Sequence, residues 1–261
     1  MSSHVNITQM DAFTYRERLA AGDVVMLIPV GSIEQHGPHA PLGVDMMLST
    51  KISELVADRV SGLVGPTVTT GYKSQQRSGG GNHIVGSIGF DADVVIGVCR
   101  TLVREFVRHG VRKIAFINGH YENYQFIYEG VDLALRDLST RGAETPSVMM
   151  LSYWDFVTPE VIEELYPDGF PGWDVEHGGV METALMLNYF PHLINMDRAM
   201  DLPAADLPLY DLLPVDPSLT PASGCLSSGV ASTAEKGVIL AESLVNGLVS
   251  AISERLGGEE E

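Results

Sequence analysis

The sequence predicts a three-layer α/β fold, in which helices cover both faces of a mostly parallel sheet. Short apolar runs, about as long as one strand, alternate with segments that carry apolar residues at a helical period, such as Leu48, Ile52 and Leu55. Strands that alternate with amphipathic helices are typical of parallel sheets buried on both faces.

The first third of the chain supplies two helix and strand pairs. Thr8 to Asp11 resembles a capping box before a helix over 12–21, which Gly22 ends. An apolar run predicts a strand over 24–30, a helical period predicts a helix over 46–60, and a β-branched run predicts a strand over 63–68. Residues 71–82 are polar and glycine-rich, which predicts a loop.

The pattern continues to about residue 153 and then changes. Asp91 begins a helix to about residue 110, and a strand over 112–118, a helix over 124–138 and a strand over 147–152 follow. Residues 153–173 mix aromatics, prolines and acids, and residues 201–221 hold five prolines, so both predict ordered loops or lids. Helices over 179–189 and 235–256 close the chain, and we expect residues 1–261 to form a single domain.

Charge and composition exclude several classes of function. The net charge is -18 with only 16 Lys and Arg, whereas phosphate binding needs clustered basic side chains, so no nucleic-acid partner is expected. No apolar stretch approaches the roughly 20 residues of a membrane span, and the N-terminus lacks a secretory pattern. We therefore expect no membrane partner and a cytoplasmic location. Cys99 and Cys225 lie far apart, which predicts free thiols.

Two pairs of metal-ligand side chains follow two of the predicted strands. Glu34 and His36 come after the first strand, and His120 and Glu122 come after the strand over 112–118. Residues two apart on an extended segment point the same way. Ligands of parallel sheets bind beyond the carboxyl ends of the strands, so we expect a metal site there.

Asp45 is a fifth candidate ligand. Five ligands are too many for one tetrahedral zinc, but they suit two metal ions if one carboxylate bridges them. Asp45 stands apart from both pairs at the start of a predicted helix, which makes it the expected bridge. His39 in the same loop is either a support for the ligands or purely structural.

A second group of residues suggests a pocket for a flat polar ligand. Trp154 and Trp173 are either core aromatics or the walls of such a pocket. His177 precedes a predicted helix and acts either as a general acid or base or as a cap of that helix. The glycines at 79–81 are not followed by a Lys-Ser/Thr pair, which favours close backbone approach to a small ligand over a phosphate loop.

The segments 31–45 and 118–123 together resemble the signature of the creatininase (creatinine amidohydrolase) family, and the blocks 71–83, 151–156 and 172–179 extend the resemblance. This resemblance implies a dinuclear metal amidohydrolase with a three-layer α/β fold, assembled as a homo-hexamer. The implied reaction is the opening of the creatinine ring to creatine by a metal-bridging hydroxide.

The resemblance also implies roles for single residues. Glu34 and His120 would hold one divalent ion, His36 and Glu122 the other, and Asp45 would bridge them, with zinc, manganese or both as the metals. Catalysis would use His177 and Glu122. The implied substrate contacts are Ser78, Tyr121, Trp154, Trp173, Asp174 and His177.

Two alternatives stay open. Residues 38–43 follow the version of this loop found across the broad family, which allows another cyclic-amide or formamide hydrolase of the same superfamily, such as one acting on a formylated pyrimidine amine. A metal-binding protein without catalysis is the alternative from a different class, and only the ligand cluster supports it.

Overall fold

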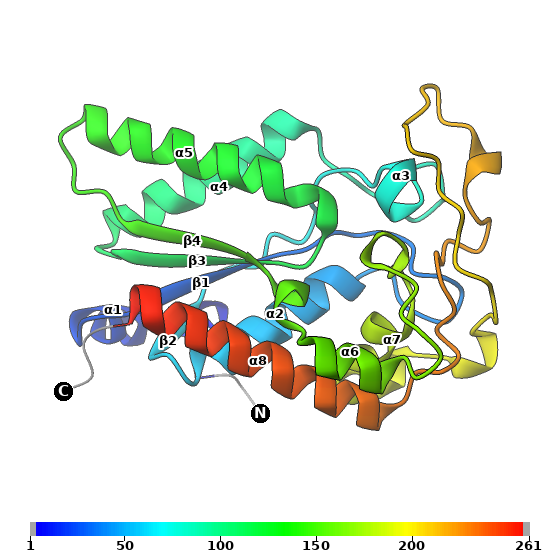
Figure 1. The fold of residues 1–261 in the computed structure, drawn as a ribbon. Coiled ribbons are helices and arrows are strands. Elements are labelled where there is room, and N and C mark those ends of the chain that lie inside the picture. The colour runs from blue at the N-terminus through cyan, green and yellow to red at the C-terminus, as the bar shows by residue number, and fades with distance from the viewer. Residues whose placement is uncertain (1–3, 258–261) are drawn as a thin grey trace.

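A parallel sheet of four strands lies between two layers of helices, as the sequence predicted (Figure 1). The computed structural model describes residues 4–257. Val30 pairs with Asn118, which in turn pairs with Ser152, and each of these is the last residue of its strand. Three neighbouring strands therefore end side by side at one edge of the sheet. The sheet order is β2-β1-β3-β4, with β1 (Val25–Val30), β2 (Gly62–Val64), β3 (Lys113–Asn118) and β4 (Ser147–Ser152).

Both faces of the sheet are buried because successive strand residues point to opposite sides. Met26, Ile28 and Phe116 pack on one side, and Leu27 and Ile117 pack on the other. The first side is covered by α4 (Ala92–Arg108) and α5 (Tyr124–Thr140), and the second by α2 (Val44–Ala57), α7 (Val180–Tyr189) and α8 (Ala234–Leu256).

Several predicted boundaries differ from the structure. The strand expected over 63–68 ends at Val64, because Pro66 cannot donate to the ladder, and Val68 keeps a single bridge to Val30. The cap of α1 (Ala12–Ala20) is Asp11, not Thr8: its side chain accepts hydrogen bonds from the amides of Phe13 and Thr14.

Two segments expected to be loops contain short helices. Within 71–82 the chain forms α3 (Gln76–Gly79). Within 153–173 it forms α6 (Pro159–Leu165), where Thr158 caps the helix and proline occupies its first position. Residues 201–221 contain one 3-10 turn (Pro217–Leu219) and no strand.

Among the described residues, α8 is the one helix with the length and composition of a membrane span. In this fold Leu240, Leu244 and Leu248 are buried with residues of α2 and α7 in one cluster. These contacts are those of a core helix that packs on its own domain.

Replacing Phe116 with alanine is expected to lower the free energy of unfolding by about 3–5 kcal/mol, because the ring is fully buried between the sheet and its helices. Chemical denaturation measures this loss. Phe13, which is 66% exposed on α1, is the matched control, and its replacement should change stability by no more than about 0.5 kcal/mol. Equal losses in the two variants would contradict the packing described above.

Candidate metal centre and active site

The predicted ligands meet at the edge of the sheet where the strands end. The side chain of His36, on the loop after β1, places Nε2 2.9 Å from Oδ1 of Asp45 in the first turn of α2. His120, after β3, places Nδ1 3.2 Å from Oδ2 of Asp45 and 3.1 Å from Oε1 of Glu34. The two oxygens of Asp45 thus face different imidazoles, which is the arrangement a bridging carboxylate requires.

Backbone carbonyls orient both imidazoles. Nδ1 of His36 lies 3.1 Å from the carbonyl of Glu34, and Nε2 of His120 lies 3.0 Å from the carbonyl of Tyr72. A carbonyl only accepts, so these nitrogens carry the protons in the neutral rings. The other nitrogen of each ring then presents its lone pair to the carboxylates, as in metal-binding histidines.

Glu182, for which the sequence predicted no role, lies beside His36. Its Oε1 is 3.5 Å from Nε2 of His36, and its Oε2 accepts a 2.7 Å hydrogen bond from the amide of Gly178. The block over 172–179 ends before Glu182, and nothing local relates the first turn of α7 to a loop after β1, so no sequence signal pointed to this contact.

The structure does not bring Glu122 to His36, the pair that the family resemblance implied. Oε2 of Glu122 lies 3.3 Å from Nε2 of His120. Its Oε1 accepts hydrogen bonds from Ser78 Oγ (2.6 Å) and from the amide of Gln75 (2.9 Å). Glu122 therefore lies on the far side of the His120 ring, against the α3 segment.

The residues fit divalent metal ions. Two groups of three ligand atoms, each within 4.8 Å of one another, share Asp45: one adds Glu34 and His120, the other adds His36 and Glu182. In the described part of the chain, the buried atoms Glu34 Oε2, His36 Nε2 and Asp45 Oδ2 have no hydrogen-bond partner. Buried carboxylates need a compensating positive charge, and no Lys or Arg lines the cavity into which these carboxylates face.

The electrostatics of the ligand cluster lead to the same conclusion. Burial opposes the imidazolium form, yet the carboxylates of Glu182 and Asp45 raise the pKa of His36 well above its ordinary value. Burial likewise opposes the charged form of His120, but Glu34 and Glu122 raise its pKa. The cluster therefore attracts positive charge, and metal ions bound there would displace protons from the rings.

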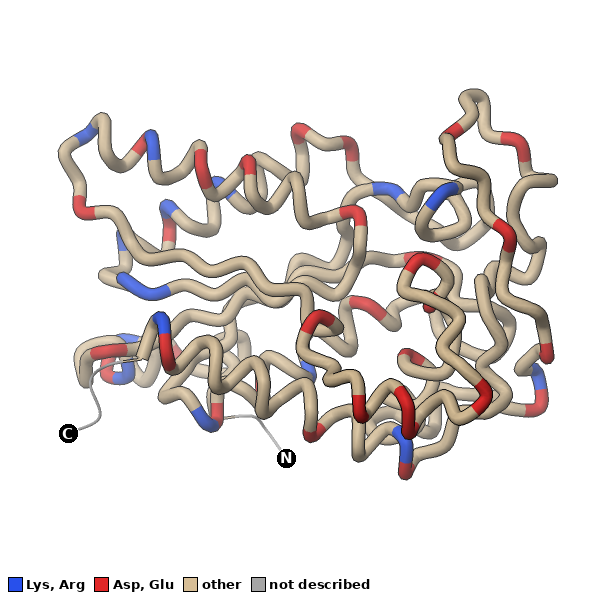
Figure 2. Tube along the Cα trace, in the orientation of Figure 1, with Lys and Arg blue, Asp and Glu red and all other residues tan. Residues whose placement is uncertain are grey.

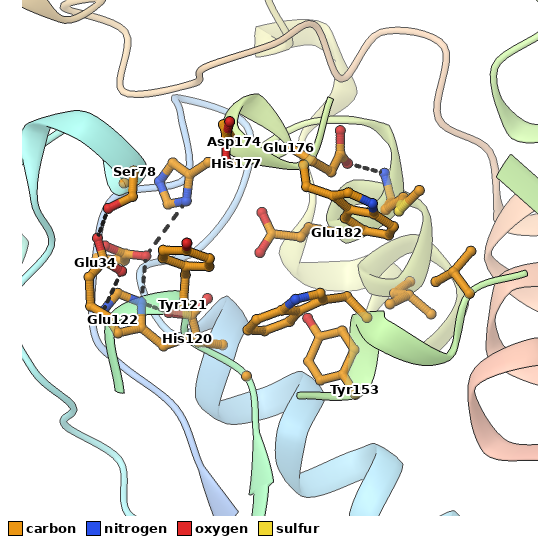
Figure 3. Close-up of a pocket in the computed structure, with 18 of the residues that line it drawn as sticks. Glu34, Ser78, His120, Tyr121, Glu122, Tyr153, Asp174, Glu176, His177 and Glu182 are labelled. Carbon is orange, nitrogen blue, oxygen red and sulfur yellow. Dashed lines mark hydrogen bonds and ion pairs between the residues drawn. The ribbon is translucent and has the colours of Figure 1, made fainter. Parts of the chain in front are cut away.

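A cavity of about 100 Å³ opens over the ligands (Figure 3). Tyr121 and Trp173 are exposed at this cavity, and Trp154 lines it together with apolar residues of α7 and α8. The structure brings every predicted substrate contact to this one cavity: Ser78, Tyr121, Trp154, Trp173, Asp174 and His177.

His177 faces the ligand cluster and does not cap α7, whose cap residue is Gly179. Its Nε2 lies 2.7 Å from the carbonyl of Gln35, so this nitrogen carries the proton of the neutral ring. Its Nδ1 lies 3.6 Å from Oε1 of Glu34, and the ring packs 4.3 Å from that of His36. Nδ1 is therefore the atom that can take up or release a proton in the cavity.

Two further sequence features have structural explanations. Nε2 of His39 lies 2.9 Å from Thr183 Oγ1, outside both ligand groups, so His39 connects the metal loop to α7. A Cβ at Gly79 would lie 2.3 Å from Ser74 Oγ and 3.1 Å from Glu122 Oε1. Glycine at 79 thus permits close packing against Glu122.

Neither thiol should react with a disulfide reagent such as DTNB in the native protein at pH 8. Burial raises the pKa of Cys99 to about 12 and that of Cys225 to about 11, so almost no thiolate forms until the pH is far higher. Thiol titration should give no fast-reacting group in buffer and two in denaturant. A fast group in buffer would contradict the burial of these side chains.

Comparison with known proteins shows which family this chain resembles. The family model for creatininase, described as creatinine amidohydrolase, matches residues 8–252. The creatinine amidohydrolase of Pseudomonas putida is 49% identical over 255 residues, which cover 97% of this chain and 98% of that protein.

Solved structures show the same similarity. A manganese creatininase ("Creatininase Mn") and a Zn-Zn form of an E122Q mutant creatininase each match with a TM-score of 0.95 and 48% identity, covering 97% of this chain and 99% of the other. An E122Q mutant creatininase complexed with creatine matches with a TM-score of 0.94, 47% identity and the same coverage. The family match and the identity over nearly the whole chain show that this chain belongs to the creatininase family.

Proposed function

We propose that this protein is a metal-dependent creatinine amidohydrolase that opens the creatinine ring to give creatine. The observation that carries the proposal is the single cavity shared by the ligand cluster and all the predicted substrate contacts. The similar structures that contain manganese, zinc or creatine support it.

Two divalent ions, zinc, manganese or both, would be held by the two ligand groups. One group is Glu34, Asp45 and His120, and the other is His36, Asp45 and Glu182. When bound, such ions lower the pKa of a water molecule toward about 7 and polarise an amide carbonyl.

His177 and Glu122 would move the protons of the reaction. Hydrolysis adds water across the ring amide, breaks the carbon-nitrogen bond and requires a proton on the departing ring nitrogen. Nδ1 of His177 faces the cavity and can carry that proton, because Nε2 is held by the carbonyl of Gln35. Glu122, with Oε1 held by Ser78 and Gln75, presents Oε2 at the other side of the cluster.

The remaining lining residues would select the substrate. Tyr121, Trp154 and Trp173 offer aromatic surfaces to a planar ring. Asp174 offers a carboxylate to the guanidino-like nitrogens of creatinine. The chain has 34 Asp and Glu against 16 Lys and Arg (Figure 2), and no Lys or Arg lines the cavity. Anionic substrates are therefore disfavoured.

We further propose that residues 1–261 form one domain, that the protein assembles as a homo-hexamer, and that it acts in the cytoplasm. The family match over 8–252 supports the single domain. Val85, Leu209 and Leu213 are almost fully exposed apolar side chains, which supports burial against another copy. Light scattering tests the hexamer.

A substrate profile tests the function directly. The metal-loaded protein should hydrolyse creatinine in preference to a formylated aminopyrimidine and to other cyclic amides. Turnover of the formamide without turnover of creatinine would support the first alternative. Bound metal without turnover of any of these amides would support the metal-binding alternative.

A further inference from the structure

A partly buried carboxylate beside the ligand cluster has no role in the reaction described above. Glu176 directly precedes His177 and lines the same cavity as Glu182. In Figure 3 the side chains of Glu176, His177 and Glu182 project from one stretch of the chain. Glu176 belongs to neither of the two ligand groups that share Asp45.

Hydrogen bonds connect Glu176 both to α7 and to the segment that contains Leu226 and Ser227. Its Oε1 accepts a 2.5 Å hydrogen bond from the amide of Met181, the residue directly before Glu182. Its Oε2 accepts a 3.4 Å hydrogen bond from Ser227 Oγ. The adjacent amide of Leu226 donates to the carbonyl of His177 at 2.9 Å.

Glu182 makes the reciprocal connection. While Glu176 reaches forward to the amide of Met181, Glu182 reaches back with Oε2 to the amide of Gly178 at 2.7 Å. Each carboxylate thus accepts from a backbone amide at the start of α7, as the side chains of a capping box do. The reciprocal pair closes the segment 176–182 into a loop that carries both His177 and Glu182.

Gly179 shows how tightly this loop is packed. A Cβ on Gly179 would lie 2.3 Å from Oε2 of Glu176 and 2.5 Å from Oγ of Ser227. The backbone dihedral φ of Gly179 is -86°, which other residues adopt without strain. Glycine is therefore required here for space, and that space is occupied by the Glu176 carboxylate.

We propose that Glu176 is a positioning residue that fixes the orientation of Glu182 toward the second metal and of His177 toward the substrate. The inference rests on the proposed function for its effect on turnover. Its effect on metal binding depends only on the ligand group of His36, Asp45 and Glu182. Replacing a side chain that supports a metal ligand in this way typically lowers metal affinity or activity by about 10–100-fold.

The test compares Glu176→Ala, Glu176→Gln and the exposed control Glu163→Ala in the cobalt-loaded protein. Glu176→Ala should lower kcat by about 10–100-fold with little change in KM. It should also lower the bound cobalt from two ions toward one per chain and alter the visible spectrum. Glu176→Gln keeps an acceptor for the amide of Met181, so it should largely restore kcat and the second cobalt ion.

Gly179→Ala keeps every hydrogen-bonding group but displaces the Glu176 carboxylate. It should reproduce the loss of kcat and of the second cobalt ion, which makes it decisive if Glu176→Ala fails to fold. Wild-type kcat and cobalt content in Gly179→Ala would overturn the proposal, and so would a Glu176→Gln variant as impaired as Glu176→Ala. If the parent protein does not hydrolyse creatinine, the cobalt content and spectrum still decide the positioning role.

Discussion

Replacing Asp45 with asparagine should reduce creatinine hydrolysis by about three orders of magnitude. Asp45 directs Oδ1 to His36 and Oδ2 to His120, so a neutral amide removes a charge that both ligand groups share. The contribution of metals to transition-state stabilisation is several kcal/mol, and each ~1.4 kcal/mol changes the rate tenfold.

Metal analysis and steady-state kinetics on the same preparations measure this effect. The variant should lose bound metal together with activity. Asp58→Asn, an exposed change beyond the other end of α2, is the control and should keep both. An Asp45→Asn protein with two bound metal ions per chain and ordinary kcat would exclude Asp45 as the bridge.

Replacing His177 with alanine should lower kcat by about 10²–10⁴-fold while the metal content stays unchanged. Nδ1 of His177 faces the cavity, whereas the ligand groups that share Asp45 do not include this ring. The variant therefore loses proton transfer and keeps both metal sites.

The exposed His192 provides the control, and His192→Ala should behave as the parent protein. Unchanged turnover in His177→Ala would reject the proton-carrying role. Loss of metal would instead make His177 a ligand, which the proximity of Glu34, His36 and His177 allows geometrically.

The parts of the site that follow directly from strands were predictable from the sequence. Glu34 and His36 follow β1, and His120 and Glu122 follow β3, and parallel strands bring their carboxyl ends to one edge. The position of Asp45 was also predictable, because it begins the helix after the first loop.

Glu182 could not be placed from local pattern. It reaches His36 only because α7 packs against α2 and α8 in the layer below the sheet, a contact between segments far apart in the chain. The same limit applies to the pairing of Glu122, whose carboxylate is held by Ser78 on the unpredicted helix α3 and by the amide of Gln75, the residue directly before that helix. Sequence spacing identified candidate ligands, but tertiary packing decided which of them lie close enough to bind one metal ion.

The most direct test of the two-metal account is stepwise addition of Zn²⁺ or Mn²⁺ to chelated protein, with metal content and creatinine turnover measured at each step. The account predicts almost no turnover without metal and full turnover only when two ions are bound per chain. Full turnover with one ion per chain, or turnover that survives complete chelation, would contradict it.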